Sequence, residues 1–182
     1  MARQIFSALI EESTRLAAEA AVPGLRYAEV QDITDKGYIL KWLSGTVRSL
    51  SAPARVARFM AGKERGGYFP LEKGDEVVVG FIDGNIDDPV ILGALWSVQD
   101  PPPPDVDTSD SNNTRAIVSR EGSRLAFDDS KGATQVLLKS AGGISITLDD
   151  KAKSLTLQFN NSTKIVLDAS GVTVTGTTIN LN

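Results

Sequence analysis

The residues best suited to acid–base chemistry are three clustered carboxylates, Asp83, Asp87 and Asp88. A glycosidase needs two carboxyl groups held across a cleft, one of them in an apolar environment that raises its pKa. These three instead surround Gly84 and Asn85, which are typical of an exposed turn. We therefore expect a turn, no catalytic residues and no enzyme activity. An enzyme that uses this cluster is kept as an alternative.

A second acidic pattern is the pair Asp128-Asp129, which recurs as Asp149-Asp150 and is followed each time by a lysine, Lys131 or Lys151. Carboxylate oxygens are the ligands that calcium prefers, so a cation site is one interpretation. The neighbouring lysines would weaken such a site. We therefore favour the other interpretation, in which these pairs form solvated turns at equivalent corners of a repeat. We expect no metal and no cofactor.

Composition excludes several kinds of chemistry. The 182 residues include no Cys and no His, which rules out disulfides, thiolate catalysis, the usual zinc sites and a histidine base. The formal net charge of -4 argues against nucleic-acid binding. The N-terminal residues lack the long apolar core of a signal peptide, so we expect synthesis in the cytosol.

Aromatic residues could provide a stacking platform for an oligonucleotide, as in some OB folds. The candidates are Trp42, Trp96, Tyr38, Phe69 and Phe81. The acidic charge and the absence of a basic stripe favour a different role for them, in a barrel core and a subunit interface.

The elements that would position these residues are mostly strands. From residue 144 onward, apolar side chains occupy every second position, which predicts strands with one buried and one solvated face. Glycine and asparagine separate the runs, and no helical segment is available to cover the apolar face. The alternation continues to the last residue with no capping element, which argues against a single-chain solenoid. We predict a homotrimeric triple-stranded β-helix (a β-prism) over residues 115–182, with each strand pairing with strands of other chains. Its trimer core comprises Ile144, Ile146, Leu148, Leu155, Leu157, Phe159, Ile165, Leu167, Val172, Val174, Ile179 and Leu181.

The preceding residues divide into three parts. Residues 1–22 have the pattern of an amphipathic helix, ended by Val22-Pro23-Gly24, and could pack on the chain's own barrel or bind a partner. Residues 23–98 contain five candidate strands, at 27–33, 38–43, 54–59, 76–82 and 90–96, which suit a small OB barrel. Residues 99–114 are a Pro-rich and acidic linker. The helix face that would bind a partner consists of Ile5, Phe6, Leu9, Ile10 and Leu16.

Several motifs of the barrel segment make the sequence recognisable. They are Ala61-Gly62-Lys63-Glu64-Arg65-Gly66, Gly74-Asp75-Glu76-Val77-Val78-Val79, Phe81-Ile82-Asp83-Gly84 and Pro89-Val90-Ile91-Leu92-Gly93-Ala94-Leu95-Trp96. This order closely resembles the OB domain of phage baseplate spike proteins (the gpV family) and of the VgrG spike of type VI secretion. Two later segments, 122–129 and 143–146, resemble the start of that family's triple-stranded β-helix.

The resemblance implies an all-β chain that forms the central spike of a contractile injection machine, as a homotrimer joined to a hub protein. It also implies assembly into a particle that acts outside the cell at the target envelope. Related spikes can end in a histidine-rich apex, which this chain cannot form. We therefore expect a separate PAAR-like tip protein, seated on Ile179, Asn180, Leu181 and Asn182. An OB-fold protein that binds glycans or nucleic acid and carries a trimerisation stalk is the alternative. The sequence leaves open which machine, target cell or toxin is involved.

Overall fold

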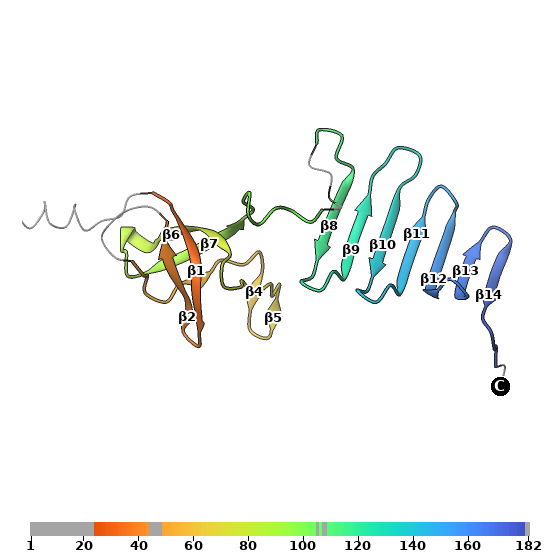
Figure 1. The fold of residues 1–182 in the computed structure, drawn as a ribbon, viewed down its shortest axis with the longest axis horizontal. Coiled ribbons are helices and arrows are strands. Elements are labelled where there is room, and N and C mark those ends of the chain that lie inside the picture. Colours follow the sequence, from red (N-terminus) through yellow and green to blue (C-terminus); the bar gives the residue numbers. More distant parts are fainter. Residues whose placement is uncertain (1–23, 44–48, 105, 107–108, 181–182) are drawn as a thin grey trace, which may run out of the picture. The chain divides into compact units, whose positions relative to one another are not determined.

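The computed structural model describes residues 24–43, 49–104, 106 and 109–180. This part of the chain is all-β and contains fourteen strands and one short 3-10 turn, η1 (Ile82–Gly84). The chain divides into two compact units, one ending at Asp100 and the other beginning at Pro101 (Figure 1). The amphipathic helix expected over residues 1–22 lies outside the described residues.

The first unit is built on a five-stranded sheet. In spatial order its strands are β2 (Gly37–Trp42), β1 (Arg26–Thr34), β6 (Glu76–Phe81), β7 (Pro89–Leu95) and β3 (Arg55–Val56). All neighbours are antiparallel except β3 and β7, which are parallel. A separate hairpin of β4 (Ala61–Gly62) and β5 (Arg65–Gly66) lies between β3 and β6 in the sequence.

Period-two alternation places one face of this sheet in the core. Val30, Leu40 and Ile91 are at most 1% exposed, and Val77 and Val79 alternate in the same way on β6. The two outer strands of the sheet are connected through an isolated bridge between Tyr38 and Ala54, with hydrogen bonds of 3.0 and 2.8 Å. A five-stranded sheet curved in this way is consistent with the partly open barrel of an OB fold.

The strands of this unit follow the sequence prediction except at one place. The strand expected over 54–59 is only two residues long, Arg55–Val56, and the chain then turns into the β4–β5 hairpin. Gly66 adopts a φ of +150°, and a Cβ atom there would lie 2.5 Å from the Met60 carbonyl oxygen. The hairpin therefore depends on the absence of a side chain at Gly66.

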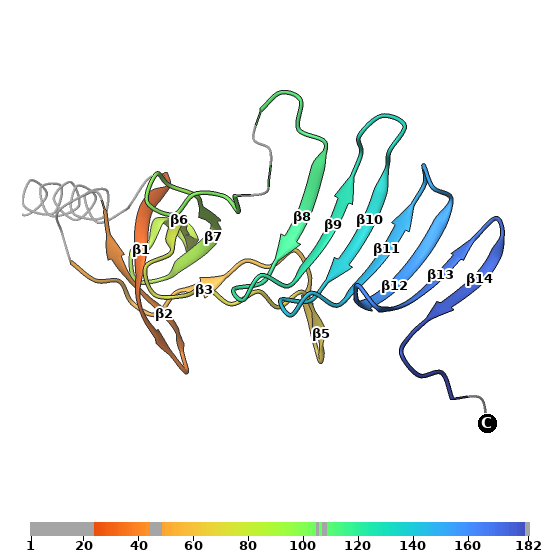
Figure 2. The same cartoon turned by 45° about the vertical axis from the view of Figure 1, so that its right-hand side comes forward.

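The second unit is a meander of seven antiparallel strands (Figure 2). Its strands are β8 (Thr114–Val118), β9 (Arg124–Asp128), β10 (Gln135–Lys139), β11 (Ser145–Asp149), β12 (Ser154–Asn160), β13 (Thr163–Asp168) and β14 (Gly171–Thr175). Each strand pairs with its neighbours in the sequence, so the order in the sheet is the order in the chain. β8 and β14 are its two open edges.

This pairing differs from the expected one, in which strands of different chains alternate. The connections are too short for it: β12 and β13, for example, are joined through Asn161 and Ser162, which favours an antiparallel hairpin within the chain. The single chain thus forms an open sheet, and it does not close on itself. The triple-stranded β-helix remains a prediction, now with each chain contributing a preformed sheet.

Candidate functional site

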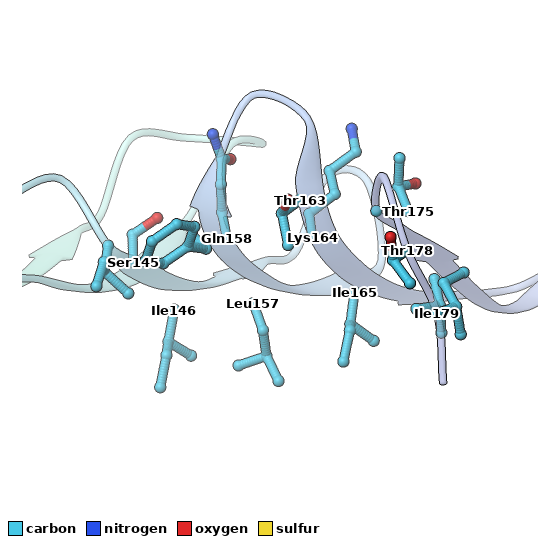
Figure 3. Close-up of a pocket in the computed structure, with 14 residues that line it drawn as sticks. Ser145, Ile146, Leu157, Gln158, Thr163, Lys164, Ile165, Thr175, Thr178 and Ile179 are labelled. Atoms are coloured by element: carbon cyan, nitrogen blue, oxygen red, sulfur yellow. The ribbon is translucent and has the colours of Figure 1, made fainter. Parts of the chain in front are cut away.

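The candidate site is the face of the second sheet that carries its large apolar side chains, here called the apolar face. The strand register arranges these side chains in two rows of cross-strand neighbours that cross the sheet. One row is Ile117, Leu125, Leu138, Ile146, Leu157, Ile165 and Val174, and the other is Phe127, Val136, Leu148, Leu155, Leu167 and Val172. Figure 3 shows Ile146, Leu157 and Ile165 pointing to the same side of the sheet, with Gln158 and Lys164 on the other.

The apolar face is open to solvent in the single chain. Leu148 is 49% exposed, Val172 67% and Leu138 51%. Among the described residues of this unit only one hydrophobic side chain is buried, that of Ala126, and it lies on the opposite face. The sheet therefore has no hydrophobic core of its own. A contiguous apolar surface of this extent is typical of a protein–protein interface.

Towards β14 the apolar face borders an open groove. Its apolar lining includes Ile144, Leu157, Phe159, Ile165 and Ile179 (Figure 3). The polar lining residues are hydroxyls, one amide and Lys164, and they include no carboxylate. This groove has the composition of a packing surface and lacks the paired titratable groups that acid–base catalysis requires.

The structure places most of the predicted trimer-core residues together. Ile146, Leu148, Leu155, Leu157, Ile165, Leu167, Val172 and Val174 belong to the two rows. Phe159 lies where the register between β12 and β13 shifts, and Ile144 precedes β11. Ile179 follows β14 and is 51% exposed, whereas Leu181 lies outside the described residues.

Five members of the apolar face were missing from the prediction: Ile117, Leu125, Phe127, Val136 and Leu138. All of them lie at alternate positions within β8 to β10, so a period-two signal was present in the sequence. The run Val136-Leu137-Leu138 concealed it, because Leu137 belongs to the other face.

The other predicted contact residues are only partly described. In the predicted tip-protein seat, Ile179 and Asn180 are exposed, and Leu181 and Asn182 lie outside the described residues. All five predicted hub contacts, Ile5 to Leu16, lie outside them as well.

The carboxylates form turns. Asp83 adopts a φ of +51° within η1 and is exposed, as is Asp87. Asp88 lies 3.6 Å from the guanidinium of Arg55. No apolar pocket encloses the three, so they lack the environment that a carboxylic acid catalyst requires.

The repeated acidic pairs also support turns. The Ser130 hydroxyl and the Ser130 N–H, the latter at 2.9 Å, both donate to Asp128 and lower the pKa of that carboxyl. Asp149 accepts hydrogen bonds from the Ala152 N–H and from the Gln135 amide, at 2.8 and 2.9 Å. Within the described ranges, no group of three or more His, Cys, Asp or Glu side chains is arranged to hold a metal ion.

The aromatic candidates fall into two groups. Trp42 is 8% exposed, and Tyr38 and Phe81 pack against the core beside it. Only Trp96 and Phe69 are well exposed, at 70% and 50%. Three of the five aromatic candidates therefore belong to the barrel core or pack against it, which is the role that the sequence analysis favoured over a stacking platform.

Residues 38–96 match the sequence model of a known protein family, the type VI secretion system/phage-baseplate injector OB domain. The matched segment runs from β2 to the residue after β7 and includes the Tyr38–Ala54 bridge. The predicted resemblance to gpV-like and VgrG-like spikes is thereby confirmed for the OB segment.

One curated relative is the type VI secretion system spike protein VgrG3 of Vibrio cholerae serotype O1. It is 32% identical over 87 residues, which amount to 46% of this chain and 9% of the relative. The chain thus spans about a tenth of that protein's length. In the part of the chain that the structure describes, no helix has both the length and the apolar character needed to cross a membrane.

Proposed function

We propose that this chain is the structural central spike of a contractile injection machine, such as a phage tail baseplate, a tailocin or an extracellular injection system. In this role it links the hub and tube to the tip and pierces the target envelope mechanically. One observation carries the proposal: a baseplate-injector OB domain precedes a seven-stranded sheet whose large apolar side chains are exposed in the single chain.

The exposed apolar face supports a homotrimer. Three copies arranged around one axis, with their apolar faces inward, would bury both rows in a common interior. Burial of apolar area stabilises such an assembly by about 25 cal/mol per Å². Closed cyclic symmetry also limits the assembly to a fixed number of copies. Two copies packed face to face would form a sandwich, and the mass of the assembly distinguishes the two arrangements.

The sheet suits a mechanical role because its strands stack along what would be the long axis of the prism. Seven strands spaced about 4.8 Å apart give a height of roughly 29 Å. Backbone hydrogen bonds between consecutive strands run in that same direction, so each wall resists compression through its ladders. This height is comparable with the roughly 30 Å hydrocarbon core of a bilayer.

The remaining partners follow from the same role. Residues 1–22, with Ile5, Phe6 and Leu9 on their apolar face, would contact the hub protein of the baseplate or tube. The end of the sheet after β14, from Ile179 to Asn182, would seat a PAAR-like tip protein. The chain would be assembled in the bacterial cytoplasm into a particle and act at the envelope of the target cell, which it would contact transiently. The role is not catalytic.

Quantitative mass spectrometry of purified particles tests this function. We expect three copies of the chain per particle, and particles without it should fail to release potassium from target cells. Absence of the chain from complete particles would contradict the proposal. Retention of the free protein on an oligonucleotide or glycan column would favour the binding-protein alternative, and lysis of cell walls that is lost in Asp88→Ala would favour the enzyme.

A further inference from the structure

The face of the second sheet opposite the apolar face has an uneven distribution of charge. At one end of the strands, the terminal positions carry Arg124, Lys139 and Lys164, here called the basic margin. At the other end they carry Asp128, Asp149 and Asp168, here called the acidic margin. The register places all six on the same face, since each alternates with the apolar rows.

The turns at each end do not reverse this difference. At the basic end, Arg120 and Glu121 form an ion pair at 3.6 Å, so the formal charge of this end, summed with Arg124, Lys139 and Lys164, is +3. At the acidic end, Asp129 and Asp150 add to the margin, and Lys131, Lys151 and Lys153 oppose it. Five carboxylates against three lysines leave a net charge of -2. Arg115, on the apolar face, donates to the carbonyl oxygens of Asn112 and Thr114.

Within one chain this arrangement is unfavourable. Lys139 is the direct cross-strand neighbour of Arg124, and like charges in such positions destabilise a sheet. On its other side Lys139 faces Ser145, which carries no charge. The oppositely charged ends of a single strand, such as Lys164 and Asp168 of β13, are about 13 Å apart along the backbone, too far for direct pairing.

The acidic margin, by contrast, is held in its charged form. The Ser130 hydroxyl and N–H donate to Asp128, and the Ser170 hydroxyl and N–H donate to Asp168, so the pKa of each carboxyl is lowered. Gln135 lies between Asp128 and Asp149 in the register. Its amide donates to Asp149 at 2.9 Å and separates the two carboxylates.

We propose that the basic margin of one copy docks against the acidic margin of the next copy around the axis. This rests on the proposed trimer and specifies how its walls meet. In a ring of identical sheets every contact is head-to-tail, so the two opposite margins always meet. Their opposite charges favour this contact and disfavour contacts between like margins, which would meet if neighbouring copies were stacked in opposite directions.

The test is a charge-reversal cycle in the full chain. Lys139→Glu/Lys164→Glu makes the basic margin acidic, and Asp149→Lys/Asp168→Lys makes the acidic margin basic. Sedimentation in moderate urea, which does not screen charge, gives the protein concentration at which half of the trimer dissociates. Exposed ion pairs are individually weak, but two pairs at each of three contacts add up. We expect each double variant to raise that concentration about tenfold, and their combination to return it to within about threefold of the wild type.

Neutral variants control for the turns. Asp149→Asn/Asp168→Asn keeps an oxygen that can accept the turn hydrogen bonds, and it should weaken the trimer less than reversal does. Raising the salt concentration should reduce the difference between wild type and the reversed variants. Two results with a stable wild-type trimer would overturn this docking and leave the proposed trimer intact. In the first, the charge reversals do not change the concentration at which half of the trimer dissociates. In the second, the combined variant dissociates at a concentration no lower than that of the weaker double variant. A monomeric wild type would overturn the proposed function as well.

Discussion

The substitution Leu157→Asp tests whether the apolar face becomes an interior. Leu157 lies in the middle of its row, between Ile146 and Ile165, and is 38% exposed in the single chain. Full burial of a leucine is worth about 1.5–3 kcal/mol, so covering this remaining fraction contributes about 1 kcal/mol per copy. Loss of that contact alone, as in Leu157→Ala, would cost about 3 kcal/mol per trimer, or roughly 100-fold in its association constant.

The aspartate adds a larger penalty. A carboxylate buried without a partner costs several kcal/mol, and the threefold axis would bring three of them together. We therefore expect no trimer of Leu157→Asp at micromolar concentration, measured by light scattering after size-exclusion chromatography. Thr156→Asp is the matched control, because it adds the same charge to the adjacent residue on the opposite face, between the two margins, and it should assemble. Normal assembly of Leu157→Asp would refute the inward orientation of the apolar face.

Three further predictions concern other parts of the chain. Gly37→Ala should destabilise the first unit by at least about 2 kcal/mol in urea unfolding, because φ is +134° there and a Cβ atom would meet the Ala54 carbonyl oxygen at 2.5 Å. Gly93→Ala is the control: open space surrounds Gly93, so this variant should keep the stability of the wild type. Equal destabilisation by the two substitutions would contradict this account. The lowered pKa of Asp168 means that its hydrogen bonds with Ser170 stabilise the fold above the ordinary aspartate value of 3.8 and that this contribution is lost as the pH falls through the lower folded value. Asp168→Asn should therefore flatten the acid side of a stability–pH curve, and an unchanged slope would count against it. Deletion of residues 1–21 should leave the trimer intact and weaken capture by the hub protein in a pull-down, and unchanged capture would remove the adaptor role.

Much of the fold was predictable because its signals are local. Period-two alternation predicts strands in both units, and Asp83-Gly84 predicts the connection between β6 and β7. The hairpin of β4 and β5 was missed because its two-residue strands are too short to show any period. Its geometry depends on close approaches of the backbone at Gly66, which side-chain patterns do not report.

The site was partly predictable for the same reason. Alternation identifies which residues share a face, and Ile146, Leu157 and Ile165 lie on one face of the sheet. Alternation does not indicate which strands pair with each other. The sequence analysis therefore predicted hydrogen-bonded pairing between strands of different chains, whereas the structure has hairpins within one chain. The charged margins also escaped the sequence analysis, because Arg124 and Lys139 become neighbours only once the register of β9 and β10 is known.

The central claim is that the apolar face of the second sheet is covered by two further copies of the chain. Sedimentation equilibrium of the full-length protein at micromolar concentration measures this directly. The account predicts a mass of about 58 kDa, three times the 19.4 kDa of one chain. A mass of 19.4 kDa with the sheet still folded would contradict it.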